Sequence, residues 1–279
     1  MSEFDPRVTP ARADLAASHL RGKVEAGRFV DGVVQEVIVG HTPVRKAPSH
    51  GATMLTEALR GERVLVLETD EEGWAWGQLL ADGYVGWLPG AALLPPGPEP
   101  THRVRAIRTF VFPAPDIKSP PQDALPLGAR LAIMHVEEPF AASANGFLPV
   151  RHLVSIDARE SDAVAVAERF LGAPYLWGGK TSLGVDCSGL VQAALTACGI
   201  PCPRDSDMQE RSLGAPVDSA DLQRGDLVFW KGHVAMARDR ATLIHANAHH
   251  MAVVIEPISE AIARIHASGS DVTSVQRIG

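Results

Sequence analysis

Apolar and polar positions follow two different patterns along the chain, and the change falls near residue 157. From about residue 30 to residue 150, short apolar runs are separated by Gly and Pro, which is typical of β-strands joined by tight turns. The runs that predict strands are 33–40, 62–69, 74–80, 84–89, 103–112, 129–137 and 146–154. Before them, Ala and Leu recur at helical spacing over residues 11–26, which predicts a helix within an N-terminal arm, residues 1–28.

The predicted strands fall into two related sets. The stretch beginning VIVGHTPVRK resembles the stretch beginning AIRTFVFPAP, and GYVGWLP in the first set resembles GFLPVRH in the second. Self-similarity at a period of about 60 residues indicates two copies of one small β domain. Residues 93–102 (LLPPGPEPTH) lie between the copies. Proline cannot donate to a sheet ladder, so this segment is expected to be a semi-rigid linker.

After residue 157 the pattern predicts helices and strands in one α+β domain. Apolar residues at helical spacing predict a helix over 160–174, and a second helix over 187–199 ends at Gly199. Four strands are predicted after it, at 226–230, 233–238, 242–247 and 252–258.

Composition and charge limit the classes of function that the chain can have. The 279 residues include 46% hydrophobic and 21% charged residues, which suits two or three soluble globular domains. A net charge of −7 argues against nucleic acid or an anionic membrane as the partner. We expect no membrane insertion and no secretory signal, because no apolar run is long enough and the N-terminus has no apolar core. Three cysteines form neither a disulfide framework nor a paired metal motif, so we expect a cytoplasmic protein without metal or cofactor.

Cys187 has the position of a nucleophile. A loop with Gly178, Gly179 and Gly184 leads to Cys187 at the start of a predicted helix. Unpaired N–H groups and the helix dipole are expected there to favour the thiolate and to hold an oxyanion. A free cysteine is more often a buried structural residue, but the small and polar neighbours of Cys187 do not describe a core position.

Two histidines can serve this cysteine. If strands 233–238 and 242–247 form a hairpin with a three-residue loop at 238–240, His233 lies directly opposite His245 on one face. One imidazole can then take the thiol proton while the other orients it. The alternative is a pair of ordinary strand histidines.

These motifs together resemble the NlpC-type cysteine endopeptidases of bacterial cell walls, over residues 160–258. The matching stretches are PYLWGG (174–179), DCSGLV (186–191), GDLVFW (225–230) and the pair His233 and His245. The resemblance implies a papain-like fold and hydrolysis of the bond between γ-D-glutamate and a diamino acid, meso-diaminopimelate or L-Lys, in peptidoglycan stem peptides. It implies a triad in which Cys187 is the nucleophile, His233 the base and His245 the orienting residue.

The same resemblance implies substrate-binding residues. Tyr175 matches a tyrosine near the thiol, although it can also be a core aromatic. Asp186 and Ser188 flank the nucleophile, and Asp205 and Ser206 lie in an R-D-S segment that helps to bind substrate in the diamino-acid-releasing branch. Asp205 or Ser206 can equally cap a helix.

Each β-rich copy resembles a bacterial SH3-like barrel, on the motif Gly83-Tyr84-Val85-Gly86-Trp87 in the first. The expected domains are the arm 1–28, SH3-like domains at 29–95 and 101–157, and a peptidase domain at 158–279. Two barrels before a peptidase resemble the subgroup that recycles released wall peptides with a free N-terminal L-Ala. That subgroup uses a tyrosine and a glutamate of the first barrel. Tyr84 matches the tyrosine, whereas Thr53 aligns with the glutamate and Glu57 follows it.

Three alternatives remain open from the sequence. A papain-like amidase or acyltransferase would use the same triad. A catalytically silent protein that binds wall peptides would need neither nucleophile nor base. A zinc enzyme would commit Cys187, His233 and His245 to the metal.

Overall fold

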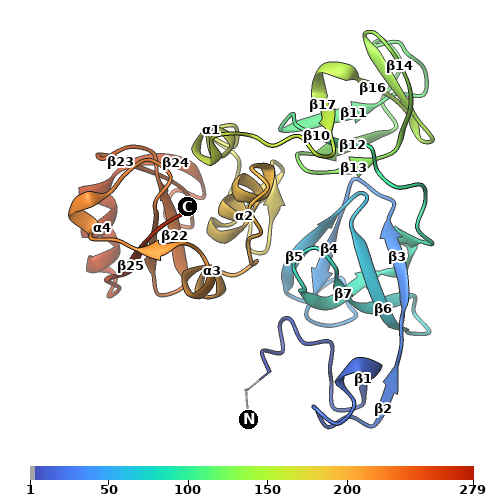
Figure 1. The fold of residues 1–279 in the computed structure, drawn as a ribbon, viewed down its shortest axis with the longest axis horizontal. Helices are drawn as coiled ribbons and strands as arrows, with labels where there is room; N and C mark the ends of the chain where they lie inside the picture. Colours follow the sequence, from blue (N-terminus) through green and yellow to red (C-terminus); the bar gives the residue numbers. More distant parts are fainter. Residues whose placement is uncertain (1–3) are drawn as a thin grey trace. The chain divides into compact units, whose positions relative to one another are not determined.

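The computed structural model describes residues 4–279 and divides the chain into two compact units, one ending at Asp157 and the other spanning Ala158–Gly279 (Figure 1). Residues 1–3 of the predicted arm lie outside the described residues. Each unit has its own hydrophobic core. No helix in residues 4–279 has the length and apolar character needed to cross a membrane.

The helix predicted over residues 11–26 is wrong. The segment forms strand β1 (Leu15–Ala17), the 3-10 turn η1 (Ser18–Leu20) and strand β2 (Arg28–Val30), with β1 and β2 paired in parallel. Its apolar side chains pack on the following barrel, and the Arg12 guanidinium lies 4.4 Å from the ring centre of Trp76. Packing against a neighbouring surface thus outweighs the strong helical preference of Ala and Leu, because tertiary contacts override intrinsic propensity.

The first β-rich segment forms one seven-stranded antiparallel sheet in the order β5-β4-β8-β7-β6-β3-β9. The strands are β3 (Val33–Val37), β4 (His41–Arg45), β5 (Met54–Leu59), β6 (Arg63–Thr69), β7 (Trp74–Leu79), β8 (Val85–Pro89) and β9 (Leu93–Leu94), with the 3-10 turn η2 (Gly90–Ala92) before β9. Alternate residues such as Val37, Val44, Val64 and Leu88 face inward and are completely buried. Predicted strands 62–69, 74–80 and 84–89 match β6, β7 and β8 to within one residue at each end.

The second β-rich segment is built from three small sheets, β13-β10-β17, β11-β12 and β14-β15-β16. Its elements are β10 (His102–Val104), β11 (Arg108–Val111), β12 (Asp123–Pro126), β13 (Arg130–Leu131), β14 (Ile133–Glu137), β15 (Phe140–Ser143), β16 (Gly146–Pro149), η3 (Val150–His152) and β17 (Leu153–Ser155). The predicted strands 103–112 and 129–137 are each broken into two. A core that includes Val104, Leu125 and Leu148 joins the sheets.

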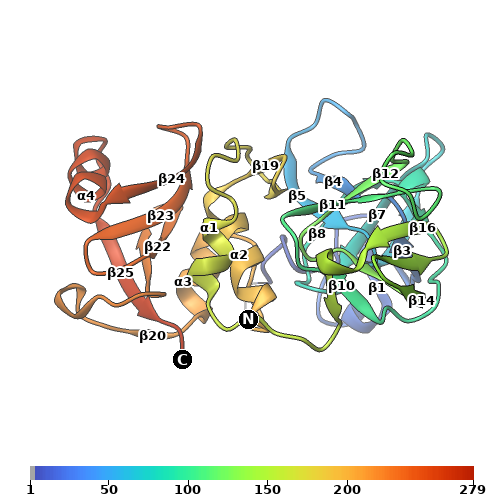
Figure 2. The same cartoon turned by 90° about the horizontal axis from the view of Figure 1, so that it is seen from above.

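The C-terminal unit is a six-stranded antiparallel sheet with helices on both faces (Figure 2). Strand order is β20-β25-β21-β22-β23-β24. The strands are β20 (Ala215–Pro216), β21 (Leu227–Trp230), β22 (His233–Ala237), β23 (Thr242–Asn247), β24 (Ala252–Pro257) and β25 (Val272–Arg277). The helices are α1 (Ala163–Glu168), α2 (Cys187–Ala197), α3 (Ser206–Ser212), α4 (Ile258–Ala267) and the 3-10 turn η4 (Ser219–Asp221). A short hairpin, β18 (Lys180–Thr181) and β19 (Gly184–Val185), precedes α2.

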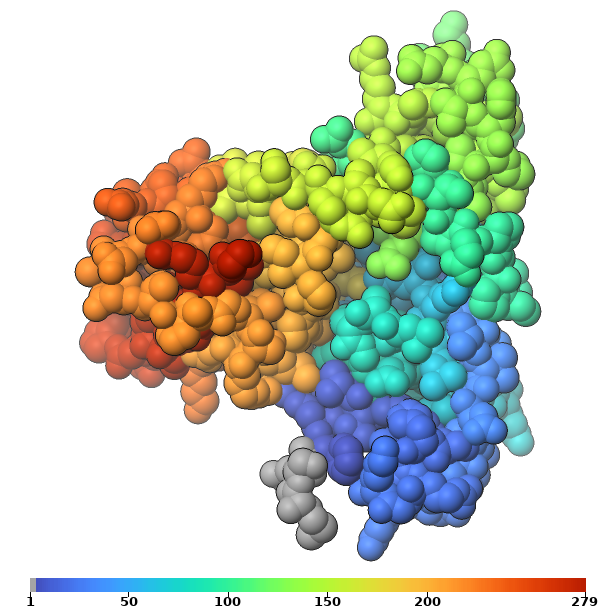
Figure 3. All heavy atoms as spheres, in the orientation of Figure 1, coloured from blue at the N-terminus to red at the C-terminus, as the bar shows by residue number. Residues whose placement is uncertain are grey.

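Helix α4 packs on one face of this sheet, and α1 and α2 pack on the other. Ala261 of α4 is completely buried against a core that includes Trp230 and Leu243. Figure 3 shows the last residues of the chain, in red, embedded among the orange segments of the same unit. This location agrees with the pairing of β25 between β20 and β21.

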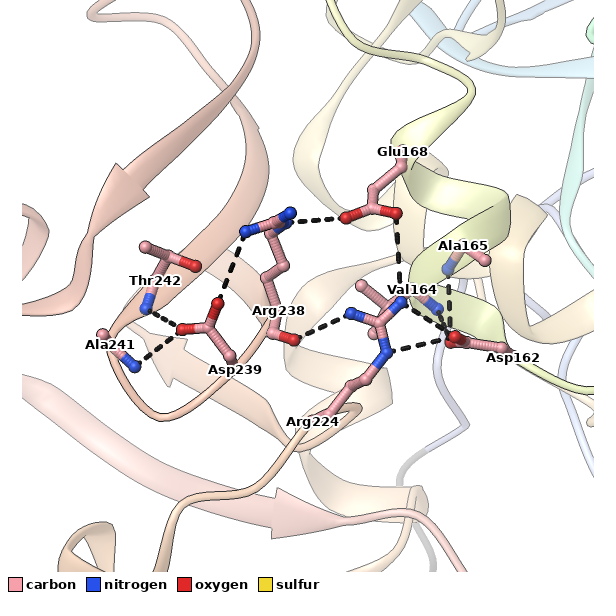
Figure 4. A network of polar contacts seen from close by, with 9 residues as sticks. All are labelled: Asp162, Val164, Ala165, Glu168, Arg224, Arg238, Asp239, Ala241 and Thr242. Atoms are coloured by element: carbon pink, nitrogen blue, oxygen red, sulfur yellow. Dashed lines mark hydrogen bonds and ion pairs between the residues drawn. The ribbon is translucent and has the colours of Figure 1, made fainter.

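A network of charged side chains holds the turn between β22 and β23 (Figure 4). Asp162 caps α1 by accepting hydrogen bonds from the N–H groups of Val164 and Ala165, and Arg224 donates to the same carboxylate. Arg238 donates to Glu168 over 2.7 Å. Asp239 accepts from the N–H groups of Ala241 and Thr242, each over 2.8 Å, which closes the turn. These pairs are partly exposed, so the network orients the turn between β22 and β23 more than it stabilises the folded protein.

The hairpin register differs from the prediction by two residues. Met236 lies opposite Ile244 and Ala237 opposite Leu243, so residue 235 and not residue 233 faces the position of His245. Side chains alternate between faces with a period of two, and a two-residue shift therefore leaves His233 and His245 on the same face. The two histidines lie diagonally across the strands.

Candidate active site

Cys187 is the first residue of α2, and the loop before it fixes its position. Asp186 is the N-cap of the helix and accepts a hydrogen bond from the N–H of Gly189 over 2.7 Å. The first turn packs directly on the glycine loop, since a Cβ at Gly189 would lie 2.2 Å from the carbonyl oxygen of Gly179. Only glycine permits this approach. Cys187 is buried, with 7% of its surface exposed.

Asp186, the residue before Cys187, forms a buried ion pair with Arg204. The Arg204 Nη1–Oδ1 distance is 2.9 Å and the Nη2–Oδ2 distance is 2.7 Å, and both side chains are buried. Asp186 also accepts from the N–H of Gly178 and from the Ser188 hydroxyl. Together with the bond from Gly189, five donors surround its two oxygens. This leaves the Asp186 carboxylate little capacity for a substrate ammonium, and the same geometry gives Ser188 a structural contact.

Strands β22 and β23 separate where the nucleophile approaches them. Within the described chain they pair only at Met236 and Ala237, and the N-terminal half of β22 pairs with β21 alone. The N–H of Val234 is therefore free of the β23 ladder, and it donates a hydrogen bond toward the Cys187 sulfur. The N–H of Ser188 does the same from the first turn of α2. The thiol thus lies beside the strand that carries His233.

His233 begins a chain of four polar side chains. Its Nε2 lies 3.0 Å from Nδ1 of His245, and Nε2 of His245 lies 3.0 Å from Oε2 of Glu256. Arg264 of α4 binds both oxygens of Glu256, over 3.0 and 2.7 Å. The sequence reasoning missed Glu256 and Arg264. The signal was present, because Glu256 is the one charged residue in the apolar stretch AVVIEPI, and a charge in a buried strand needs a partner.

The charge state of the free site differs from the expectation. Burial, reinforced by the charge of Asp186, raises the pKa of Cys187 to about 12. Burial also lowers the pKa of His233 to about 3 and that of His245 to about 4. Cys187 and His233 are therefore neutral thiol and neutral imidazole at pH 7. This differs from the predicted preference for a resting thiolate, because desolvation acts against the N–H groups at the helix start.

Tyr175 lies close to the nucleophile. Burial raises the pKa of its phenol, and the proximity of Cys187 and Asp186 adds to this effect. The backbone of Tyr175 is held by a hydrogen bond from its N–H to the carbonyl of Met251 and by a bridge to Val185. The hydroxyl remains protonated and can donate a hydrogen bond beside the thiol.

The remaining predicted substrate-binding residues lie at the start of α3 and in the N-terminal unit. Asp205 is the N-cap position of α3, and Ser206 is the first residue of that helix. Tyr84 and Glu57 belong to the N-terminal unit: Tyr84 is buried in the core of the first barrel, and Glu57 on β5 bonds to Nδ1 of His41 over 2.8 Å. Within the C-terminal unit, Asp186 and Ser188 flank Cys187, Tyr175 interacts with Cys187, and His233 is hydrogen-bonded to His245.

The zinc alternative finds no support in this geometry. Among residues 4–279, no group of three or more His, Cys, Asp and Glu side chains is arranged to hold a metal ion. The side chains nearest His245, those of His233 and Glu256, instead form the series of hydrogen bonds that ends at Arg264.

Comparison with known proteins agrees with the two-part architecture. Residues 44–93 match the SH3 domain of bacterial dipeptidyl-peptidases, and residues 172–270 match the NlpC/P60 family. A crystal structure of an NlpC/P60 family protein from Bacillus cereus superposes with a TM-score of 0.75 over 88% of this chain and 99% of that one. At 23% identity this similarity shows the fold, a papain-like NlpC/P60 domain with an SH3-like domain.

Curated relatives match over different lengths. The γ-D-glutamyl-L-lysine dipeptidyl-peptidase of Bacillus cereus is 39% identical over 106 residues, which cover 35% of this chain and 32% of that protein. The protein of the same name in Bacillus subtilis is 29% identical over 240 residues, covering 74% of this chain and 77% of that protein. The "Probable endopeptidase NlpC" of Escherichia coli is 34% identical over 106 residues, covering 33% of this chain and 68% of that protein. With the buried cysteine at a helix start and the paired histidines, these matches establish that the chain belongs to the NlpC/P60 family of cysteine peptidases.

Proposed function

We propose that this chain is an endopeptidase that hydrolyses the bond between γ-D-glutamate and a diamino acid, meso-diaminopimelate or L-Lys, in peptidoglycan stem peptides. The observation that carries the proposal is the Cys187 thiol beside β22, whose first residue, His233, is hydrogen-bonded to His245. The bond specificity is supported by similarity to the Bacillus subtilis dipeptidyl-peptidase over 74% of this chain.

The reaction begins with proton transfer from the Cys187 thiol to His233. The sulfur then attacks the γ-D-glutamyl carbonyl carbon, the new C–S bond forms, and the carbonyl electrons move to oxygen. In this proposal, N–H groups at the start of α2 and the Tyr175 hydroxyl stabilise that oxygen. Because the resting pair is neutral, charge separation occurs only when this proton transfer begins the reaction.

The second half of the reaction releases both products. The oxyanion collapses, the C–N bond breaks, and the His233 imidazolium gives its proton to the departing amine. Water then loses a proton to His233 and attacks the thioester, and the C–S bond breaks with return of the proton to sulfur. The products are a peptide ending in D-glutamate and a diamino acid or a peptide that begins with one.

We place the substrate's free N-terminal L-Ala at the first barrel. Residues 44–93 match the SH3 domain of dipeptidyl-peptidases, a class that removes two residues from a free N-terminus. Tyr84 and Glu57 are the candidate amine-recognition residues, and Glu57 already bonds to His41. Asp205 and Ser206 are the candidate contacts to the diamino acid. The segment 101–157 is proposed as a second SH3-like domain.

A requirement for a free amine fits cytoplasmic recycling of released peptides.

Mass spectrometry of products tests the proposal. The substrates are L-Ala-γ-D-Glu-meso-diaminopimelate, its L-Lys counterpart, and N-acetylated copies of both. We expect L-Ala-γ-D-Glu from the free peptides and no cleavage of the acetylated ones. Cleavage of both forms would remove the amine requirement and keep the peptidase. Cleavage of neither, with intact folded protein, would contradict the proposed bond specificity and favour a papain-like amidase or acyltransferase.

A further inference from the structure

The two catalytic-site histidines are linked to a carboxylate that faces them from the next strand. Glu256 lies on β24, its Oε2 is 3.0 Å from Nε2 of His245, and it is buried. Arg264 of α4 donates a hydrogen bond to each oxygen of the Glu256 carboxylate. The Arg264 guanidinium holds the pKa of Glu256 below its usual range, so Glu256 is ionised at neutral pH. An ionised carboxylate can only accept hydrogen bonds.

The ionised state of Glu256 determines which ring nitrogens of His245 and His233 carry hydrogens. Because Glu256 only accepts, Nε2 of His245 must carry a hydrogen. Burial lowers the pKa of His245 to about 4, so the ring is neutral and its Nδ1 has a lone pair. Nε2 of His233, 3.0 Å away, must then donate to that lone pair. The ring of His233 is also neutral, which leaves its Nδ1 as the only unprotonated nitrogen of that ring.

We infer that Glu256 and Arg264 are positioning residues that select the His233 tautomer with a free Nδ1, the form able to accept the Cys187 proton. If the carboxylate were replaced by a group that donates to His245, the hydrogen of His245 would move to Nδ1. That nitrogen would donate to His233, whose own hydrogen would move to Nδ1. The base would then present an N–H in place of a lone pair.

The carboxylate also acts during the reaction. When His233 accepts the thiol proton it becomes an imidazolium that still donates through Nε2 to His245. The negative charge of Glu256, transmitted through the polarised His245 ring, favours this cation in a buried site. Only this base role of His233 depends on the proposed function. The tautomer assignment concerns the free protein and stands without any substrate.

The test is a Glu256→Gln variant, because glutamine preserves the shape of the side chain and can donate as well as accept. NMR of protein labelled with ¹⁵N-histidine distinguishes protonated from unprotonated ring nitrogens. In the wild type we expect Nε2 to be protonated and Nδ1 unprotonated in both His233 and His245. In Glu256→Gln we expect a population with the hydrogens on Nδ1, and a kcat lower by about 10–100-fold with KM little changed. This loss is smaller than the ~10⁴-fold loss when a carboxylate directly beside a catalytic histidine becomes an amide.

Three further variants separate positioning from structural support. Glu260→Gln removes an exposed carboxylate of α4 and should change neither the tautomers nor kcat. Arg264→Met, at a side chain that is a quarter exposed, should shift the tautomers in the same direction as Glu256→Gln, and Arg264→Lys should restore most of the wild-type pattern. Wild-type tautomers and kcat in folded Glu256→Gln and Arg264→Met would overturn the inference. Because the NMR result needs no substrate, it also stands apart from any failure of the proposed bond specificity.

Discussion

Arg204 and Asp186, the residue before Cys187, meet through two hydrogen bonds of 2.9 and 2.7 Å. Arg204 also donates to the Ser188 hydroxyl and to the carbonyl of Gly179. One side chain thus ties the glycine loop to the first turn of α2. Arg204 therefore helps to fix the position of Cys187, the first residue of that helix.

Removing the Arg204 guanidinium should destabilise the protein strongly. Arg204→Met would leave the Asp186 carboxylate buried and without its cation, at a cost of about 3–5 kcal/mol in the free energy of unfolding. Urea denaturation measures this. The matched control is Arg211→Met, which breaks the exposed pair with Asp207 and should cost less than about 0.5 kcal/mol. Equal losses in the two variants would show that the buried pair has no special role.

The resting thiol should be unreactive at neutral pH. Burial raises the pKa of Cys187 to about 12, and the thiolate is the species that reacts with iodoacetamide. Below that pKa the thiolate fraction rises tenfold per pH unit, so alkylation should accelerate steadily between about pH 6 and 9. Peptide mapping follows Cys187 separately from Cys198 and Cys202. A plateau in this range would instead mean a preformed thiolate–imidazolium pair.

Tyr175 should contribute to the chemical step and little to folding. Tyr175→Phe removes a hydroxyl that stays protonated beside the thiol, and loss of one donor to an oxyanion lowers kcat by about 100–1,000-fold at most. We expect a decrease of at least about tenfold, with the urea midpoint unchanged. Steady-state kinetics on the free tripeptide measure the first quantity. An unaltered kcat would make Tyr175 a packing residue.

The sequence predicted individual strands and helix starts better than it predicted their packing and register. Strand β23 occurs over residues 242–247 as predicted, and α2 begins at Cys187, because period-two apolar runs and a capped helix start are local signals. The arm before the first barrel was predicted as a helix, since nothing local reveals that Leu15 and Leu20 pack on a barrel surface. The hairpin register failed for a similar reason: Asp239 closes the turn one residue later than assumed.

The candidate site shows the same division between local and long-range information. Cys187, His233 and His245 stand out by motif and spacing. Glu256 and Arg264 are 11 and 19 residues beyond His245, and only the folding of β24 and α4 beside β23 brings them to it. Arg204, 17 residues beyond Cys187, was overlooked in favour of its neighbour Asp205. Partners of buried charges are set by tertiary structure, which one sequence does not specify.

The most direct test of the account compares Cys187→Ala with Cys198→Ala for release of L-Ala-γ-D-Glu from the free tripeptide, followed by mass spectrometry. Cys198 is a partly buried cysteine at the C-terminal end of the same helix, so its substitution controls for the general loss of a thiol. We predict that Cys187→Ala lowers the rate by at least about 1,000-fold while remaining folded, and that Cys198→Ala retains wild-type activity. Full activity in purified Cys187→Ala protein would contradict the nucleophile assignment and the mechanism built on it.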